Sequence, residues 1–230
     1  MKNPVAPIDW LTRLAHDLRS PITPMRFAVQ LLQSDRLPPG RAPELLDTMD
    51  RQIDLLLQLA DELTDMIKIG SDQYSLQLHE YDLAPILEDA VRRSARAACR
   101  LGKIGGPMPI RAPAHPVRVV ADEVRLAQLI AHLLGILGMP EADNSRLCIE
   151  YEQHADRALV RLCDSERGIW RDARIDYLVT GNPPLDPGVL GMSQVIYREI
   201  ASRHDASITL GQETEDRIGV LQLSLPLAPT

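Results

Sequence analysis

The sequence predicts an α+β protein in which a long helical hairpin precedes a mixed sandwich of helices and strands. In the first third of the chain, apolar residues recur in steps of three and four, which is the spacing of one helix face. Further on, short β-branched runs occur among amphipathic segments without a regular strand–helix–strand repeat. With 230 residues, of which 45% are hydrophobic and 25% charged, the chain is long enough for one large globular domain or two small ones.

The first helix is predicted from about Leu11 to a turn-forming segment at residues 35–43. Pro38, Pro39 and Gly40 in that segment are strong turn residues. One face of the predicted helix carries Leu11, Leu14, Leu18, Ile22, Met25, Val29 and Leu32.

The second helix is predicted to start at Pro43, a residue that suits a first helical turn. Its apolar residues alternate steps of three and four and so form a heptad seam: Leu46, Met49, Ile53, Leu56, Ala60, Leu63 and Ile67. A hairpin cannot bury two such stripes by itself. We therefore expect a homodimer in which two hairpins form a four-helix bundle. The alternative is that the hairpin packs on the rest of its own chain.

The second half contains the predicted α+β sandwich. Its expected helices are residues 83–98, 122–137 and 193–203. Its expected strands are residues 117–120, 146–152, 158–163, 207–210 and 220–225. We interpret residues 101–116 as an irregular insertion and residues 181–188 as a loop, because both are rich in Gly and Pro.

Composition excludes several classes of function. Aromatic residues make up only 3% of the chain, which disfavours base stacking on single-stranded nucleic acid. The net charge of -7 disfavours binding to a phosphate backbone. We therefore expect no nucleic-acid partner.

The three cysteines indicate neither a metal centre nor a disulfide framework. Cys99, Cys148 and Cys163 are odd in number and widely spaced, so we expect no metal site and a reducing compartment. The N-terminus lacks an apolar signal core, and the most apolar stretch, residues 129–139, is too short to span a bilayer. We expect a cytoplasmic protein without membrane insertion.

His16 is the candidate for chemistry in the hairpin. It lies between Leu14 and Leu18 but off the apolar seam, so its imidazole should face solvent. Asp17 follows it directly, and Pro21 and Pro24 each remove a helix hydrogen bond shortly afterwards. The alternative is an ordinary surface histidine on a helix bent by prolines.

The run HDLRSP at residues 16–21 resembles the phosphoacceptor box of bacterial two-component sensor histidine kinases. The rest of the hairpin resembles their two dimerisation helices, and YDLAPILEDAV resembles the entry to their ATP-binding domain. The resemblance implies a dimerisation and phosphoacceptor hairpin at residues 8–72. It also implies an α/β sandwich of the GHKL ATPase type at residues 73–230.

The resemblance further implies that His16 is phosphorylated on a ring nitrogen. Asp17 would hold the other ring nitrogen as a hydrogen-bond donor. Ser20, four residues after His16, should face the same side, where the family often has Thr or Asn to orient water for phosphatase action. The alternative is that Ser20 is a plain surface serine.

The helix at residues 122–137 resembles the family's N-box but departs from it. The scaffold positions fit at Asp122, Arg125, Leu126, Gln128, Leu133 and Leu134. His132 and Ile136 replace the two asparagines, and Met139 replaces a basic residue. Because Mg²⁺ requires oxygen ligands, Ile136 cannot take the place of the magnesium-binding asparagine.

The glycine boxes depart from the family in a similar way. Asp164 stands where the family contacts the adenine amino group, and Gly168 and Gly191 are kept. Glu166 and Ser193 stand where glycines are expected, which adds bulk or charge beside an anionic ligand. His204, Asp205 and Ala206 stand where the family has H-G-G, and the lid region between the glycine boxes lacks the family's Phe-rich box.

These departures predict weak or absent ATP binding, because phosphoryl transfer relies on positioning and charge neutralisation. The leading hypothesis is a histidine phosphotransfer protein of a phosphorelay with no cofactor. Its expected partners are response-regulator receiver domains and, upstream, a hybrid kinase. The first alternative is an ATP- and Mg-dependent histidine kinase with a divergent pocket. The second is a pseudokinase that sequesters a response regulator.

Overall fold

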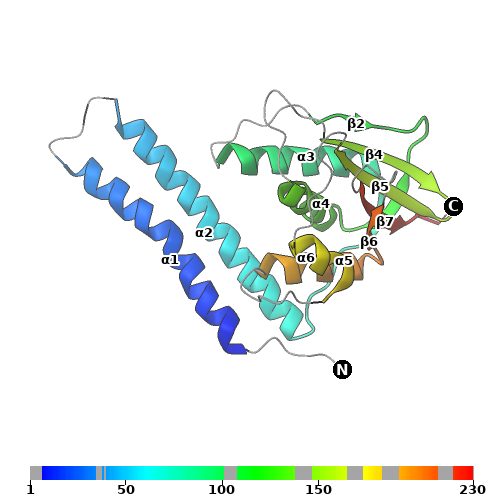
Figure 1. Cartoon of the computed structure of the whole chain (residues 1–230), viewed down its shortest axis with the longest axis horizontal. Coiled ribbons are helices and arrows are strands. Elements are labelled where there is room, and N and C mark those ends of the chain that lie inside the picture. The colour runs from blue at the N-terminus through cyan, green and yellow to red at the C-terminus, as the bar shows by residue number, and fades with distance from the viewer. Residues whose placement is uncertain are drawn as a thin grey trace. The chain divides into compact units, whose positions relative to one another are not determined.

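The computed structural model describes residues 7–34, 38, 40–100, 108–137, 147–164, 173–182, 192–211 and 220–229. The chain divides into two compact units, Met1–Gln73 and Tyr74–Thr230. Figure 1 shows the first unit as a pair of long helices and the second as a mixture of helices and strands. The α+β prediction is confirmed.

The first unit is the predicted helical hairpin. Helix α1 spans Pro7–Leu32 and α2 spans Ala42–Gly70. Pro43 lies in the first turn of α2, where its missing N–H costs no helical hydrogen bond. Gly40 in the connection has φ +85°, a left-handed conformation that glycine adopts without steric cost.

The second unit contains two sheets. Strands β1 (His79–Asp82) and β3 (Arg118–Ala121) form an antiparallel pair. The larger sheet has the order β2-β4-β5-β7-β6, in which β2 is parallel to β4 and the other neighbours are antiparallel. Its strands are β2 (Ile110–Arg111), β4 (Leu147–His154), β5 (Arg157–Asp164), β6 (Ser207–Gly211) and β7 (Val220–Pro226).

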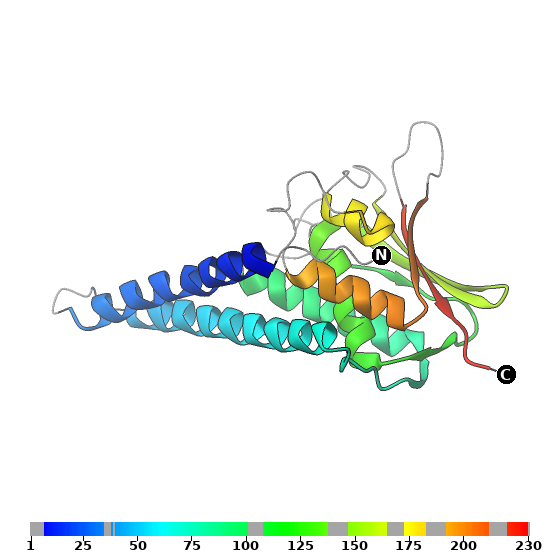
Figure 2. The ribbon, with the colours of Figure 1, turned by 90° about the horizontal axis from the view of Figure 1, so that it is seen from below.

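Four helices accompany these sheets: α3 (Leu83–Arg100), α4 (Glu123–Leu137), α5 (Ala173–Thr180) and α6 (Met192–Arg203). Figure 2 shows them on one face of the larger sheet. Leu126, Ile130 and Leu133 on α4 are almost fully buried, as are Ile149 and Leu162 on the facing strands. The core is therefore aliphatic, as expected from the scarcity of aromatic residues.

Most predicted elements of the second unit are confirmed, and three were missed. Strand β1 is short and polar, so its sequence HEYD lacks the apolar alternation of a half-buried strand. Strand β2 lies inside residues 101–116, which we had interpreted as irregular, and consists of two residues at the sheet edge. Helix α5 spans eight residues of the lid region, too few for a clear helical period.

Among the residues that the structure describes, no helix has the length and hydropathy needed to cross a membrane. The same ranges contain no group of three or more His, Cys, Asp or Glu side chains arranged to hold a metal ion.

Candidate functional site

The imidazole of His16 is highly accessible to solvent. It lies near the middle of α1, and 82% of its side chain is exposed to solvent. The prediction that His16 faces away from the apolar seam is confirmed, since Leu14 two residues earlier is buried. An incoming group can therefore reach the ring without any rearrangement of the hairpin.

Asp17 fixes which nitrogen of His16 is available. The Nδ1 atom of His16 lies 3.3 Å from Oδ1 of Asp17. A carboxylate oxygen only accepts hydrogen bonds, so Nδ1 carries the hydrogen in this pair. In the neutral ring Nε2 then bears the free lone pair, which is the atom able to attack an electrophile.

Ser20 and the two prolines lie on the same stretch of α1. Ser20 is exposed one turn after His16, so the two side chains share a helix face. Pro21 and Pro24 lie within the helix and lack the amide hydrogens that would reach the carbonyl groups of Asp17 and Ser20. The helix nevertheless continues through both prolines, so this turn keeps its helical backbone with fewer internal hydrogen bonds.

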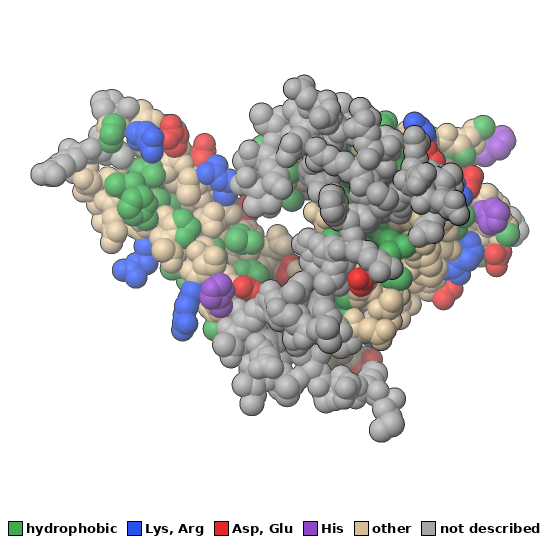
Figure 3. Space-filling model, viewed as in Figure 1, with side chains coloured by type: hydrophobic (Ala, Val, Ile, Leu, Met, Phe, Trp, Pro, Cys, Tyr) green, Lys and Arg blue, Asp and Glu red, His purple; other side chains and the backbone are tan. Residues whose placement is uncertain are grey.

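The hairpin exposes large apolar side chains near this turn and along both helices. In Figure 3 they gather as green patches over the two helices. They are Ile22, Phe27, Val29, Leu46, Ile53, Leu55, Leu57 and Ile67. Leu46, Ile53 and Ile67 belong to the heptad seam predicted for α2, so that seam is not covered by α1 alone.

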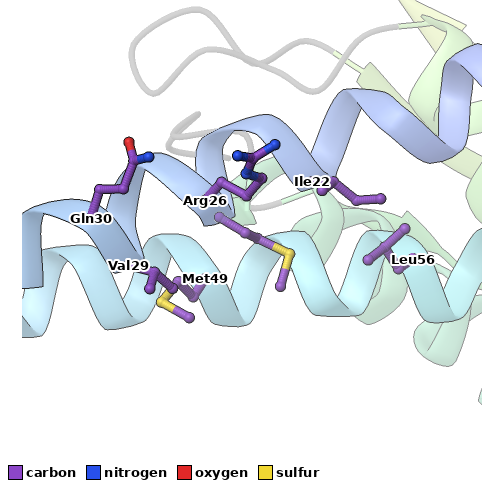
Figure 4. Close-up of a pocket in the computed structure, with 7 residues that line it drawn as sticks. Ile22, Arg26, Val29, Gln30, Met49 and Leu56 are labelled. Atoms are coloured by element: carbon purple, nitrogen blue, oxygen red, sulfur yellow. The ribbon is translucent and has the colours of Figure 1, made fainter. Parts of the chain in front are cut away.

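A shallow apolar groove of about 340 Å³ runs between α1 and α2. Ile22, Val29, Met49 and Leu56 line it from both helices, while the polar ends of Arg26 and Gln30 point away from α2 (Figure 4). Its walls offer no cluster of polar groups that could orient a small polar ligand. The groove is therefore suited to an apolar protein surface.

In the second unit, the helix that resembles the N-box is α4, and the residue before it, Asp122, caps its N-terminus. Asp122 accepts hydrogen bonds from the backbone N–H groups of Arg125 (3.1 Å) and Gln77 (3.0 Å). Leu126, Leu133 and Leu134 are buried, as a scaffold helix requires. Asp122 thus caps the start of α4, and the three leucines pack the helix into the core.

The two asparagine substitutions sit on the same helix. The ring of His132 stacks on the ring of Tyr197 of α6, with centroids 4.0 Å apart and planes 22° apart. Ile136, half-buried one turn later, presents only carbon atoms. The first substituted position is therefore used to pack α4 against α6, and the second offers nothing to a cation.

His204 is a second histidine used for structure. It is almost completely buried, its Nδ1–H donates to the carbonyl of Ile200 (2.8 Å), and its Nε2 accepts from the N–H of Asp122 (3.0 Å). This pattern requires the neutral ring. Burial lowers the pKa of His204, while the hydrogen bond to Ile200 and the charge of Asp122 oppose that shift.

The structure places only part of the predicted nucleotide pocket. Asp164 is the last residue of β5, opposite Leu147, and its side chain is outside the described residues. Gly168 and Gly191, together with Glu166 and Met139, also lie outside the described residues. Sequence reasoning did not find Tyr197, because a contact between α4 and α6 has no local sequence signal.

Comparison with known proteins agrees with the hairpin geometry. Residues 8–72 match the sequence family described as His Kinase A (phospho-acceptor) domain. The alginate biosynthesis sensor protein KinB of Pseudomonas aeruginosa is 24% identical over 168 residues, which cover 70% of this chain and 27% of the relative. Sensor protein kinase PmrB of the same species is 23% identical over 215 residues, which cover 92% of this chain and 44% of the relative. The chain thus spans less than half the length of these relatives.

Solved structures share the fold. The Acinetobacter baumannii histidine kinase AdeS superposes with a TM-score of 0.62 at 17% identity, covering 93% of this chain and 98% of that one. Histidine kinase ThkA, solved in complex with response regulator protein TrrA, gives a TM-score of 0.56 at 16% identity, covering 96% of this chain and 62% of that one. At these identities the likeness concerns the fold, a helical hairpin followed by a kinase-type α/β domain.

Proposed function

Because this chain is a relative of the two-component histidine kinases and carries their phosphoacceptor domain, we propose that His16 exchanges a phosphoryl group with an aspartate of a response-regulator receiver domain. The observation that carries this proposal is the exposed His16 ring with Nδ1 held by Asp17. In this proposal residues 8–72 are the phosphoacceptor hairpin, and residues 73–230 are a degenerate ATPase-like domain.

The proposed step is a displacement at phosphorus. Nε2 of His16 attacks the phosphorus of the receiver's aspartyl phosphate, the P–O bond to the aspartate breaks, and the carboxylate leaves with the electron pair. The imidazole gains positive charge as the P–N bond forms. The carboxylate of Asp17, hydrogen-bonded at Nδ1, stabilises that charge and keeps the ring oriented. The reverse step returns the phosphoryl group to a receiver.

The hairpin surface supports a protein partner and a second copy of the chain. Ala15 and Ile22, one residue before and six residues after His16, are exposed and could anchor a receiver domain. The exposed seam of α2 would be covered in a four-helix bundle formed by two hairpins. That ThkA was solved with a response regulator supports the receiver as the class of partner.

In this proposal the second unit does not bind ATP. The ring stack of His132 on Tyr197 and the hydrocarbon side chain of Ile136 support this, because they replace the polar groups a magnesium–nucleotide complex needs. The unit would instead be structural or help to dock the receiver. Expected cofactors are therefore none, with ATP and Mg²⁺ as the requirement of the kinase alternative.

The experiment that separates these functions supplies the phosphoryl group from two sources. The full chain is mixed either with a labelled, phosphorylated receiver domain or with labelled Mg-ATP, and acid-labile, base-stable label on the chain is measured. Label from the receiver alone supports the proposal, whereas label from ATP would establish the kinase alternative. Receiver binding without label from either source would establish sequestration. His16→Gln is the control that must lose label in the first two cases.

A further inference from the structure

Strands β4 and β5 bring two cysteines together that are distant in the sequence. Cys148 and Cys163 are direct partners in the antiparallel register, between the pairs Leu147–Asp164 and Ile149–Leu162. The structure shows both as thiols rather than as a disulfide. Sequence spacing gave no sign of this pair, because the register of a sheet is set by tertiary structure.

The geometry of the pair follows from its hydrogen bonding. The N–H of Ile149 donates to the carbonyl of Pro109 at 3.0 Å, on the β2 side of β4. Successive N–H groups of a strand point to opposite sides, so the N–H of Cys148 points toward β5. Cys148 and Cys163 are therefore a hydrogen-bonded pair, whose Cα atoms are about 5.5 Å apart. That separation lies within the range of about 4.4–6.8 Å that a disulfide spans.

Both thiols lie on the face of the sheet away from the helices. Tyr151, on the opposite side of β4 from Cys148, is buried, and its hydroxyl is influenced by the charges of Asp82, just before α3, and Glu88, within α3. Cys148 therefore shares the outer face with Glu150. Cys148 is buried and Cys163 is half-buried, so Cys163 is the thiol more open to a small molecule.

A cation stands beside the pair. The guanidinium of Arg111, on the neighbouring strand β2, is ion-paired with Glu150 and interacts electrostatically with both Cys148 and Cys163. The pKa of Arg111 is raised, first by its hydrogen bond to Glu150 and then by its electrostatic interactions with the two cysteines. Because such an interaction is mutual, Arg111 favours the thiolate form of the cysteines, which is the nucleophilic form.

We propose that Cys148 and Cys163 form a reversible redox switch whose oxidant is hydrogen peroxide and whose reductant is a thiol. The thiolate of Cys163 attacks the distal oxygen of the peroxide, the O–O bond breaks, and one water leaves after protonation. The sulfenic acid formed on Cys163 is attacked by the thiol of Cys148, which forms the S–S bond and releases a second water. In total, two thiols are oxidised to one disulfide while one peroxide is reduced to two waters.

The disulfide is expected to be easily reduced. Cβ atoms of directly opposite strand residues lie about 4.5–5.5 Å apart, whereas a relaxed disulfide holds them about 3.8 Å apart. Closing the bond thus pulls the two strands together, and strained disulfides belong to the labile, regulatory class. The bond would also restrain the end of β5 next to Asp164, the acid predicted to face adenine. This site lies outside the phosphoacceptor hairpin and does not depend on the function of His16.

The test uses the full chain with Cys99→Ser, which leaves only the two cysteines of the pair. The protein is treated with hydrogen peroxide, alkylated under denaturing conditions, and analysed by intact mass and peptide mapping. The expected product has lost the mass of two hydrogen atoms and carries no alkyl group. Peptide mapping should show one peptide joined through Cys148 and Cys163. Dithiothreitol should restore both thiols. Two alkylated thiols, or separate sulfinic acids, after the same treatment would overturn the proposal.

Single variants test the order of the steps and the role of charge. In the Cys148→Ser background dimedone should trap a sulfenic acid on Cys163, whereas the Cys163→Ser chain should react about 10-fold more slowly at Cys148. Arg111→Gln should slow the oxidation several-fold, and Glu150→Gln should accelerate it, since it removes the opposing charge. Equal rates in these two variants would overturn the assignment to Arg111, and circular dichroism controls for folding.

Discussion

The hairpin and the second unit differ in how far their histidines are exposed and in what the ring nitrogens contact. In the hairpin, His16 is 82% exposed and holds one nitrogen ready for chemistry. In the second unit, His204 is 2% exposed and uses both nitrogens in hydrogen bonds that join α6 to the start of α4. His132 in the same unit stacks on Tyr197.

This difference shows which of these histidines can meet a ligand without giving up contacts within the fold. A side chain whose polar atoms are engaged within the fold must give up those contacts to meet a ligand, at a cost of about 1–3 kcal/mol for each buried group left unsatisfied. The exposed ring of His16 has no such cost. This difference supports the proposal that His16 of the hairpin carries the phosphoryl group.

The largest expected effect is on phosphoryl uptake, which should depend on a residue of the hairpin and not on a residue of the second unit. His16→Gln should reduce phosphoryl uptake from a receiver by about 10³-fold or more, because the nucleophile is gone. Asp164→Asn should leave the rate within about twofold of the parent chain, since no nucleotide takes part. Both rates are measured with a labelled phosphorylated receiver. A loss of uptake in Asp164→Asn would contradict the division of roles.

The next effect concerns assembly of the hairpin. Ile53→Glu places a charge in the exposed heptad seam of α2, where burial of an isoleucine stabilises by about 1.5–3 kcal/mol. The residue counts twice in a symmetric dimer, so the dissociation constant should rise at least about 100-fold. Sedimentation equilibrium measures it.

Arg51→Glu is the matched control for assembly, because Arg51 is exposed on α2 outside the predicted seam. It changes the charge by more than Ile53→Glu does, yet should leave the dissociation constant within about threefold. A chain that is monomeric before any substitution would refute the four-helix bundle.

A moderate effect concerns acid stability of the second unit. The folded-state pKa of His204 is lowered by burial, whereas the unfolded chain titrates this residue near its ordinary value of about 6.5. As pH falls through about 6.5, the unfolded state binds more protons than the folded state, so the contribution of His204 to stability is lost. Urea unfolding of the second unit, followed at pH 7.5 and 5.5, should show this loss.

His204→Gln provides the comparison for that measurement. It should cost about 1–3 kcal/mol at pH 7.5, because the hydrogen bonds to Ile200 and Asp122 are not both replaced. Its stability should then vary less between the two pH values than that of the parent chain. An unchanged pH dependence would show that His204 is not the group responsible.

The smallest effect concerns two glycines of the second unit. Gly181 has φ +76°, and an added Cβ would clash with the guanidinium of Arg198, whose Nη1 donates to the carbonyl of Tyr177. Gly181→Ala should therefore destabilise by about 1–2 kcal/mol. Gly135→Ala, in α4 where nothing lies within 4 Å, should stabilise by about 0.5–1 kcal/mol. Thermal unfolding of both variants gives the signs, and equal signs would contradict this account.

The hairpin could be predicted almost entirely from the sequence. Its helices follow from local spacing of apolar residues, its break from Pro38 and Gly40, and the exposure of His16 from its place off the seam. The long strands β4 and β5 and helices α3, α4 and α6 were also predictable, because each carries its own periodic pattern. Strand β2 and helix α5 were missed, since elements of two and eight residues carry too little pattern.

By itself the sequence determined most element types, the candidate histidine His16 and the departures from the N-box, because these depend on residues close together in the chain. Only the tertiary structure decided what lies opposite what: Cys163 opposite Cys148, Tyr197 against His132, and Asp122 against His204. These contacts join segments far apart in the chain, and their register is set by the burial of whole faces rather than by any local signal. The proposed site of the hairpin thus depends on residues that are neighbours in the sequence, whereas Cys148 and Cys163 come together only once β4 and β5 have paired.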